Sequence, residues 1–205
     1  MAQSVERWCD YAKWDFAQCN SMDEFTQKLE KLPGMLILES EKYALGDHLK
    51  ELEKLIRKGV IIVFGCLENP QNIENNEELQ DFLGIYKVAS EKTELTGVKL
   101  FEGLLLGGEV VYETPKEAEE KERQDLQLEA PWYQVGSGTK TYMVGLLDQT
   151  KMNGSVNNED LPTIIWRNGI EGGSVFAVVG DYLKDSTALG LLDGMVAEAS
   201  EYYLY

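Results

Sequence analysis

Three short, nearly continuous apolar runs constrain the fold of this chain more than any other feature of its sequence. They lie at Met35–Leu38, at residues 60–64 and at residues 175–179. An unbroken apolar run of four or five residues is typical of a strand covered on both faces, as in a parallel sheet. The first two runs alternate with segments of helical periodicity. This alternation predicts right-handed crossovers and an open α/β sheet within one large domain of 205 residues.

Capping and stop signals predict the helices. Ser21-Met22-Asp23-Glu24 is a capping box, and Pro33-Gly34 ends the helix that it starts. In the last expected helix, residues 187–201, Leu189, Leu192 and Val196 should form the buried face. The other helices are expected at residues 5–13, at residues 43–58, and after a cap at Asn75 or Asn76 that precedes buried Leu79, Phe82 and Leu83.

The second half of the chain has the pattern of an antiparallel extension, because short glycine-rich turns such as Gly107-Gly108 join its strands. Strands are expected at residues 86–89, 98–106, 109–112, 139–146 and 163–166, with an edge strand at 14–19. Residues 114–129, dense in Lys, Glu and Gln, fit either a surface helix or a mobile excursion. The predicted fold is therefore an open, mostly parallel mixed sheet with helices on both faces and an antiparallel extension.

Charge and cysteine content exclude several classes of partner. The formal net charge is -17, with 36 acidic and 19 basic residues, so phosphate backbones and anionic membrane surfaces are repelled. The apolar runs are far too short to span a membrane. Cys9, Cys19 and Cys66 form neither a disulfide framework nor a zinc-binding pattern. We therefore expect no nucleic-acid partner, no direct membrane insertion, no metal and no cofactor.

Two glycine-flanked apolar segments carry a family resemblance. One is Met35-Leu36-Ile37-Leu38-Glu39, followed by a helix and Gly59-Val60-Ile61-Ile62-Val63-Phe64-Gly65; the other is Gly172-Gly173-Ser174-Val175-Phe176-Ala177-Val178-Val179-Gly180-Asp181. Both resemble the flavodoxin-like sheet of class I glutamine amidotransferase-like domains. Residues 161–205 are similar to the bacterial domain of unknown function 2194, in which such a domain is fused to a polysaccharide deacetylase-like domain. This resemblance implies an accessory role in carbohydrate or cell-envelope metabolism, with an envelope-associated or extracytoplasmic full-length protein.

Cys66 stands where the nucleophile of such a fold would stand, at the end of a buried strand. The glycines that flank a nucleophile elbow at two residues on either side are replaced by Phe64 and Glu68. The one histidine, His48, precedes the cysteine, so no base of the family's kind follows it. The resemblance therefore implies the fold without glutaminase activity. Cys66 is either a structural thiol, partly buried and slow to alkylate, or an unorthodox nucleophile with Glu68 as its base.

Two sets of residues are candidates for ligand binding. Glu39, Glu68 and Asp181 follow three buried strands and could form an acidic cleft for a cation or a polyol at the carboxyl edge of the sheet. The alternative is that they simply face solvent. Trp166-Arg167-Asn168 offers an aromatic face, a guanidinium and an amide that could hold a sugar. The alternative there is that Trp166 packs under the core with Arg167 outside.

The apparent lack of an opening strand, and the aromatic end Tyr202-Tyr203-Leu204-Tyr205, predict a fragment of a longer multidomain protein. Two classes of function stay open. The favoured one is a non-catalytic module that binds a ligand or docks against a neighbouring domain of the same polypeptide. The other is a hydrolase or amidotransferase with an atypical site around Cys66.

Overall fold

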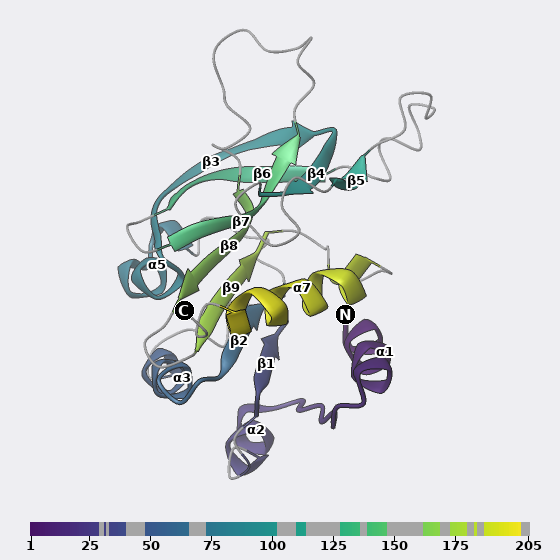
Figure 1. The fold of residues 1–205 in the computed structure, drawn as a ribbon. Coiled ribbons are helices and arrows are strands. Elements are labelled where there is room, and N and C mark those ends of the chain that lie inside the picture. Colours follow the sequence, from purple (N-terminus) through teal and green to yellow (C-terminus); the bar gives the residue numbers. More distant parts are fainter. Residues whose placement is uncertain are drawn as a thin grey trace, which may run out of the picture.

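A seven-stranded sheet in the order β1-β2-β9-β8-β7-β4-β5 forms the centre of the protein, and β3 and β6 form a second, two-stranded sheet (Figure 1). This computed structural model describes residues 1–28, 31, 33–39, 48–65, 73–101, 110–113, 128–135, 139–146, 162–168, 173–179, 183 and 187–201. The strands are β1 Met35–Leu38, β2 Ile61–Phe64, β3 Ile85–Leu95, β4 Gly97–Leu100, β5 Val110–Glu113, β6 Leu128–Val135, β7 Thr139–Leu146, β8 Pro162–Asn168 and β9 Ser174–Val178. The helices are α1 Ala2–Ala12, α2 Met22–Lys28, α3 His48–Ile56, α5 Glu77–Leu83 and α7 Thr187–Glu201.

The three apolar runs form the parallel part of the large sheet. β1 pairs with β2, and β2 pairs with β9, all in parallel. From β9 onward each neighbouring pair (β9-β8, β8-β7, β7-β4 and β4-β5) is antiparallel. The structure therefore confirms an α/β fold with an open mixed sheet and an antiparallel extension in the second half of the chain. Two of the six strand pairs of this sheet are parallel, fewer than the mostly parallel sheet that the sequence predicted.

Helices cover both faces of the sheet, as the apolar runs predicted. On one face, Val63 and Phe176 contribute to a core that also contains Trp8 of α1 and Leu192 of α7. On the opposite face, residues of α3 and α5 pack with Ile62, Phe64 and Ala177. Neighbouring residues of β2 and β9 thus enter different cores, because successive side chains of a strand point to opposite faces. Figure 1 shows α7 across one face of the sheet with α1 beside it.

The predicted caps are present at two helices. The hydroxyl oxygen of Ser21 accepts from the backbone N–H of Glu24 at 3.2 Å, and the Glu24 carboxylate accepts from the N–H of Asn20 at 2.9 Å. The carboxylate thus reaches one residue beyond the usual partner of a capping box. At α5, Asn76 rather than Asn75 is the cap, since its side chain accepts from the N–H of Leu79. Gly84 ends α5 in a left-handed conformation, φ 73°, which glycine adopts without steric cost.

Two element predictions were wrong. Residues 14–19 form no strand, since the chain there has no regular secondary structure. In α7 only Leu192 of the predicted face is buried. Leu189 and Val196 are half-buried, and the fully buried positions are Ala188, Leu191, Leu192, Met195 and Ala199. The helix is rotated from the predicted face because it must cover both the sheet and α1.

Strand β6 was missed, because Pro131 in its middle argues against a ladder strand. It pairs with β3, which is longer than predicted, and the pairing has irregular register near that proline. The last two residues of the predicted excursion at 114–129 belong to β6, and the others lie outside the described residues. The start of the predicted helix at 43–58 and the end of the predicted strand at 98–106 also lie outside the described residues.

Two glycines of α7 should respond in opposite ways to the same substitution. A Cβ at Gly190 meets nothing within 4 Å, whereas a Cβ at Gly194 would collide with the hydroxyl oxygen of buried Tyr142. We expect Gly190→Ala to stabilise the protein by about 0.5–1 kcal/mol, since alanine loses less backbone entropy in a helix. Gly194→Ala should destabilise it by about 1–3 kcal/mol through overpacking. Urea unfolding of both variants checks this, and equal shifts in unfolding free energy would contradict it.

Candidate functional site

The carboxyl ends of β1, β2 and β9 lie at one edge of the sheet because these strands are parallel. Open α/β sheets bind ligands at this edge. Glu39 comes directly after β1 and is exposed. Cys66, Glu68 and Asp181 lie outside the described residues. The acidic cleft and the role of Cys66 therefore stay predictions.

The end of β2 is tightly packed up to the residue before Cys66. Gly65 is buried, and its N–H donates to the carbonyl oxygen of Leu38 at 2.7 Å, so the pairing with β1 continues one residue past the strand. A Cβ at Gly65 would collide with the thioether of Met1 and would lie 3.4 Å from the Leu38 oxygen. A larger residue at 65 would displace the end of the Met1 side chain, so the N-terminal residue packs on this strand end.

His48, the one histidine of the chain, is the first residue of α3 and is half-buried. The other end of α3 lies near the amino ends of the parallel strands. There the backbone of Ile56 is so close to Gly173, the residue before β9, that a Cβ at Gly173 would collide with it. A helix of nine residues is about 13 Å long, so His48 lies well away from that edge, on the side where the parallel strands end.

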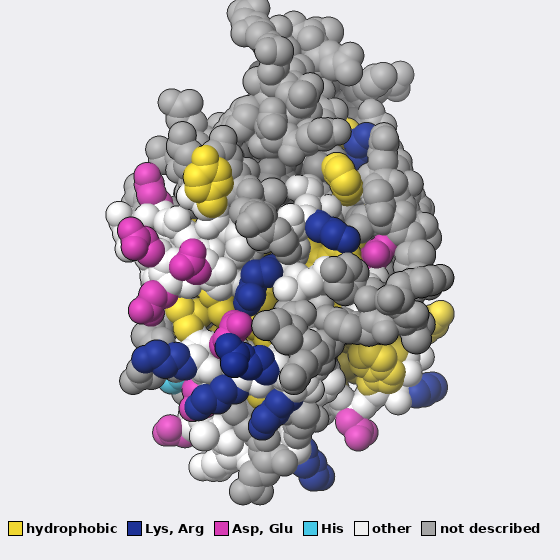
Figure 2. Space-filling model, turned by 60° about the vertical axis from the view of Figure 1, so that its left-hand side comes forward, with side chains coloured by type: hydrophobic (Ala, Val, Ile, Leu, Met, Phe, Trp, Pro, Cys, Tyr) yellow, Lys and Arg dark blue, Asp and Glu magenta, His cyan; other side chains and the backbone are white. Residues whose placement is uncertain are grey.

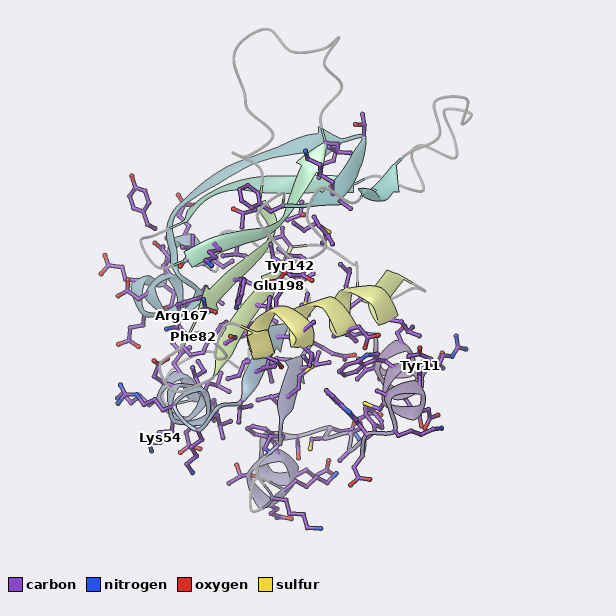
Figure 3. The ribbon with its side chains drawn as sticks, viewed as in Figure 1. Tyr11, Lys54, Phe82, Tyr142, Arg167 and Glu198 are labelled. Carbon is purple, nitrogen blue, oxygen red and sulfur yellow. The ribbon has the colours of Figure 1, made fainter. Side chains whose placement is uncertain are left out.

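Arg167 lies near the amino ends of the parallel strands, whereas Glu39 follows the carboxyl end of β1. It pairs in register with Val175, close to the start of β9. Its Nη2 donates to Glu53 Oε2 at 3.1 Å, and its guanidinium carbon lies 5.1 Å from the centre of the Phe82 ring. Figure 3 shows Arg167 and Phe82 next to each other. Arg167 therefore joins β8 to α3 and α5, and it cannot share a ligand with Glu39.

Trp166 and Arg167 point to opposite sides of the sheet, because they are adjacent residues of β8. Trp166 is buried and stacks on Phe176, with ring centroids 5.6 Å apart and planes 8° apart. The alternative, a tryptophan packed under the core, is confirmed. Arg167 is not outside, since its side chain is only 19% exposed.

A buried phenol that the sequence did not single out lies between β7 and α7. Tyr142 packs edge-on against Phe176, with centroids 5.5 Å apart, and its hydroxyl oxygen lies close to Gly194. Burial, and then the charge of Glu198, raise the pKa of this phenol well above its usual value, so it is a neutral group that can donate a proton in a hydrogen bond. A glycine in the middle of a helix was the available signal, because it often marks a close packing contact.

Three aromatic side chains at the end of α1 are exposed: Tyr11 by 73%, Trp14 by 46% and Phe16 by 37%. We call them the aromatic surface. Lys13 ends α1 in a left-handed conformation, φ 59°, and the N–H of Trp14 donates to the carbonyl oxygen of Cys9 at 2.9 Å. This turn folds Trp14 back toward the helix.

Trp14 is held in place by buried groups. Its ring meets that of Trp8 edge-on, with centroids 4.9 Å apart. Trp8 is buried, and its Nε1 donates to Asp193 Oδ1 of α7 at 2.6 Å. A chain of contacts from α7 through Trp8 thus fixes the position of Trp14. Two exposed aromatic side chains, Tyr11 and Phe16, flank this fixed ring in the sequence.

The part of the chain that the structure describes contains no group of three or more His, Cys, Asp and Glu side chains that could hold a metal ion. Burial, and then the charge of Asp10, raise the pKa of the Cys9 thiol, which makes this cysteine a poor nucleophile. Among the described helices, none is long and apolar enough to cross a membrane.

Comparisons with known proteins give no family. No family model matches the chain, and no curated protein matches it. Among solved structures, the exo-β-1,4-mannosidase Op5Man5 from Opitutaceae bacterium strain TAV5 is 12% identical with a TM-score of 0.39, over 82% of this chain and 25% of that chain. The cytoplasmic protein STM3548 from Salmonella typhimurium is 12% identical with a TM-score of 0.45, over 88% of this chain and 75% of that chain. This chain thus spans a quarter of the mannosidase, and likenesses this distant do not assign a function.

Tyr142 should make the protein sensitive to alkaline pH. The unfolded phenol ionises above pH about 10, whereas the folded phenol stays protonated, so the unfolded state binds fewer protons there. Stability should fall as pH rises above about 10, by about 1.4 kcal/mol per pH unit from this group. Urea unfolding between pH 8 and 11 should show a shallower loss for Tyr142→Phe than for the wild type. Tyr11→Phe, at an exposed position, is the control and should follow the wild type; equal slopes for all three proteins would contradict the prediction.

Proposed function

We propose that the chain is a non-catalytic, amidotransferase-like module that docks against a neighbouring domain of the same polypeptide in carbohydrate or cell-envelope metabolism. The accessory context rests on the resemblance to the bacterial family in which such a module is fused to a polysaccharide deacetylase-like domain. The open α/β sheet is compatible with that resemblance. The favoured partner is therefore a carbohydrate-active domain encoded in the same chain.

The main support for the docking proposal is the exposure of the aromatic surface. Exposed aromatic side chains that lie close together mark interaction surfaces, and Trp and Tyr are enriched among the residues that dominate interface energy. Tyr11, Trp14 and Phe16 lie within six consecutive residues, and Trp14 is fixed by Trp8. A side chain that is already fixed loses little conformational entropy when a partner covers it. Figure 3 shows Tyr11 on α1, on the far side of the molecule from α3.

The non-catalytic part of the proposal rests on the missing base. A thiol needs a positioned base to act as a hydrolytic nucleophile near neutral pH. The chain has one histidine, and it begins α3 instead of following Cys66. The packing of Gly65 against Met1 and Leu38 supports a structural role for this end of β2.

Docking should protect the aromatic surface from solvent. We expect hydroxyl-radical labelling of Tyr11 and Trp14 to fall several-fold in the longest natural polypeptide that contains these 205 residues, compared with the chain alone. Tyr86, which is 66% exposed and lies near α5, is the internal control and should label equally in both. Unchanged labelling of Tyr11 and Trp14 would show that no neighbouring domain covers them. Tyr11→Ser should leave the stability of the chain alone within about 0.5 kcal/mol, as expected for a surface substitution.

Glutaminase activity should be absent. Purified protein incubated with glutamine should release no ammonia above the level of the Cys66→Ser variant, because Cys66 has no downstream histidine to accept its proton. A class I amidotransferase that retains its catalytic histidine serves as the positive control. Ammonia release that disappears in Cys66→Ser would instead support the alternative, a hydrolase or amidotransferase with an atypical site around Cys66.

A further inference from the structure

Strand β1 lies at one end of the large sheet and has a free edge. Figure 1 shows β2 and β9 following it in the sheet, and in the described part of the chain β2 is the one strand that pairs with β1. The carbonyl oxygens of Gly34 and Leu38 accept hydrogen bonds from backbone N–H groups of the β2 segment. Because main-chain groups of successive residues alternate between the two edges of a strand, those of Met35 and Ile37 point away from β2.

The outward main-chain groups of β1 have no partner among the described residues. Neither the N–H nor the C=O of Met35 or Ile37 forms a hydrogen bond there. The side chains of Met35, Leu36 and Ile37 are apolar, yet all three are only half-buried. This edge therefore offers two donors and two acceptors together with apolar side chains on both faces of the sheet.

The edge of β1 also lacks the features that keep edge strands apart. At the other end of the sheet, β5 contains Glu113, and the register of β4 against β5 shifts between Val98 and Lys99. Charges and bulges of this kind prevent an edge strand from pairing with another chain. Charged side chains are common on the described surface, as Figure 2 shows for one face. The four residues of β1 include none, and they pair with β2 in unbroken register.

We propose that two copies of this chain pair through β1 and form one continuous sheet. A two-fold axis through Leu36, perpendicular to the sheet, makes the two β1 strands antiparallel, as in an isologous dimer. Met35 of each copy then lies opposite Ile37 of the other, and each of these two pairs exchanges two hydrogen bonds. Every outward N–H and C=O group of Met35 and Ile37 is satisfied in this way.

The apolar side chains of β1 are matched in the same register. The axis keeps each face of one sheet on the same side as that face of the other. Met35 therefore meets Ile37 beside the core that contains α1 and α7, and the two Leu36 side chains meet beside the core that contains α3 and α5. Apolar cross-strand pairs of this kind stabilise antiparallel strands. A second copy always brings this apolar set at the required positions.

Opposite charges at the two ends of β1 favour the antiparallel arrangement. Lys31 precedes the strand, Glu39 follows it, and both side chains are exposed. In the proposed register Glu39 lies opposite Pro33 of the second copy, and Lys31 of that copy is two residues further along the chain. Long side chains reach such diagonal neighbours, so Glu39 of each copy faces Lys31 of the other. A parallel arrangement would bring like charges together instead.

The dimer should be weak. Pro33 has no N–H group, so the ladder ends there and the interface stays small. Two chains of net charge -17 also repel each other, although a Debye length of about 8 Å at 0.15 M ionic strength limits this repulsion. We therefore expect a dissociation constant on the order of micromolar to millimolar at that ionic strength.

A disulfide across the axis tests the register. Leu36→Cys places two thiols in a non-hydrogen-bonded pair whose Cα atoms are about 4.5 Å apart, within the range for a disulfide. In a Cys19→Ser/Cys66→Ser background, oxidation of Leu36→Cys should give a covalent dimer in good yield. Met35→Cys, an adjacent half-buried position, is the matched control. Its yield should be at least about fivefold lower, because its thiol faces Ile37 of the second copy.

Exchange of the end charges is a second test that leaves β1 intact. Lys31→Glu and Glu39→Lys each place like charges across the axis, so we expect the dissociation constant from sedimentation equilibrium to rise about fivefold for each. The double variant exchanges the two charges and should return to the wild-type value. Circular dichroism verifies that every variant is folded.

Three results would each overturn the proposal. The first is a wild-type protein that stays monomeric up to about 1 mM, which would leave the edge to a strand from elsewhere in a longer polypeptide. The second is an equal disulfide yield from folded Leu36→Cys and Met35→Cys. The third is a double charge variant that associates no better than the single variants.

Discussion

Every side chain of β2 is apolar and buried, so both faces of that strand have to be covered, and the arrangement of the other elements follows from this requirement. The burial of β9 is equally complete. Because alternate residues of these strands enter different cores, a helix layer is needed on each side: α1 and α7 on one, α3 and α5 on the other. A buried aliphatic side chain contributes about 1.5–3 kcal/mol, so the apolar side chains of these two strands contribute substantially to stability.

The amino ends of the parallel strands are closely packed. At the amino edge the backbone of Ile56 lies against Gly173, and Arg167 is paired with Glu53. These contacts hold α3 against the sheet. Arg167 has a structural role because it pairs with Glu53 of α3. Glu39, Gly65 and Val179 directly follow β1, β2 and β9 at the carboxyl ends of these strands, where open α/β sheets bind ligands. Any small-molecule function of this fold would therefore be built there.

The aromatic surface depends on the helix layer formed by α1 and α7. Asp193 of α7 accepts a hydrogen bond from Trp8, and the Trp8 ring contacts that of Trp14. Packing between segments that lie far apart along the chain therefore sets the position of this surface.

The sequence by itself determined the features whose signals are local: the strands of unbroken apolar residues, the cap at Ser21, and the lack of a histidine after Cys66. It left Asn75 and Asn76 as alternative caps of α5, and the structure decided for Asn76. It did not determine β6, because strand pairing with β3 outweighed the local effect of Pro131. Nor did it place Arg167, whose partners Glu53 and Phe82 lie about eighty or more residues away along the chain but adjacent in space. Only the tertiary structure decided which side chains share a face or an edge, because packing between distant segments sets those distances, and no local pattern in the sequence records them.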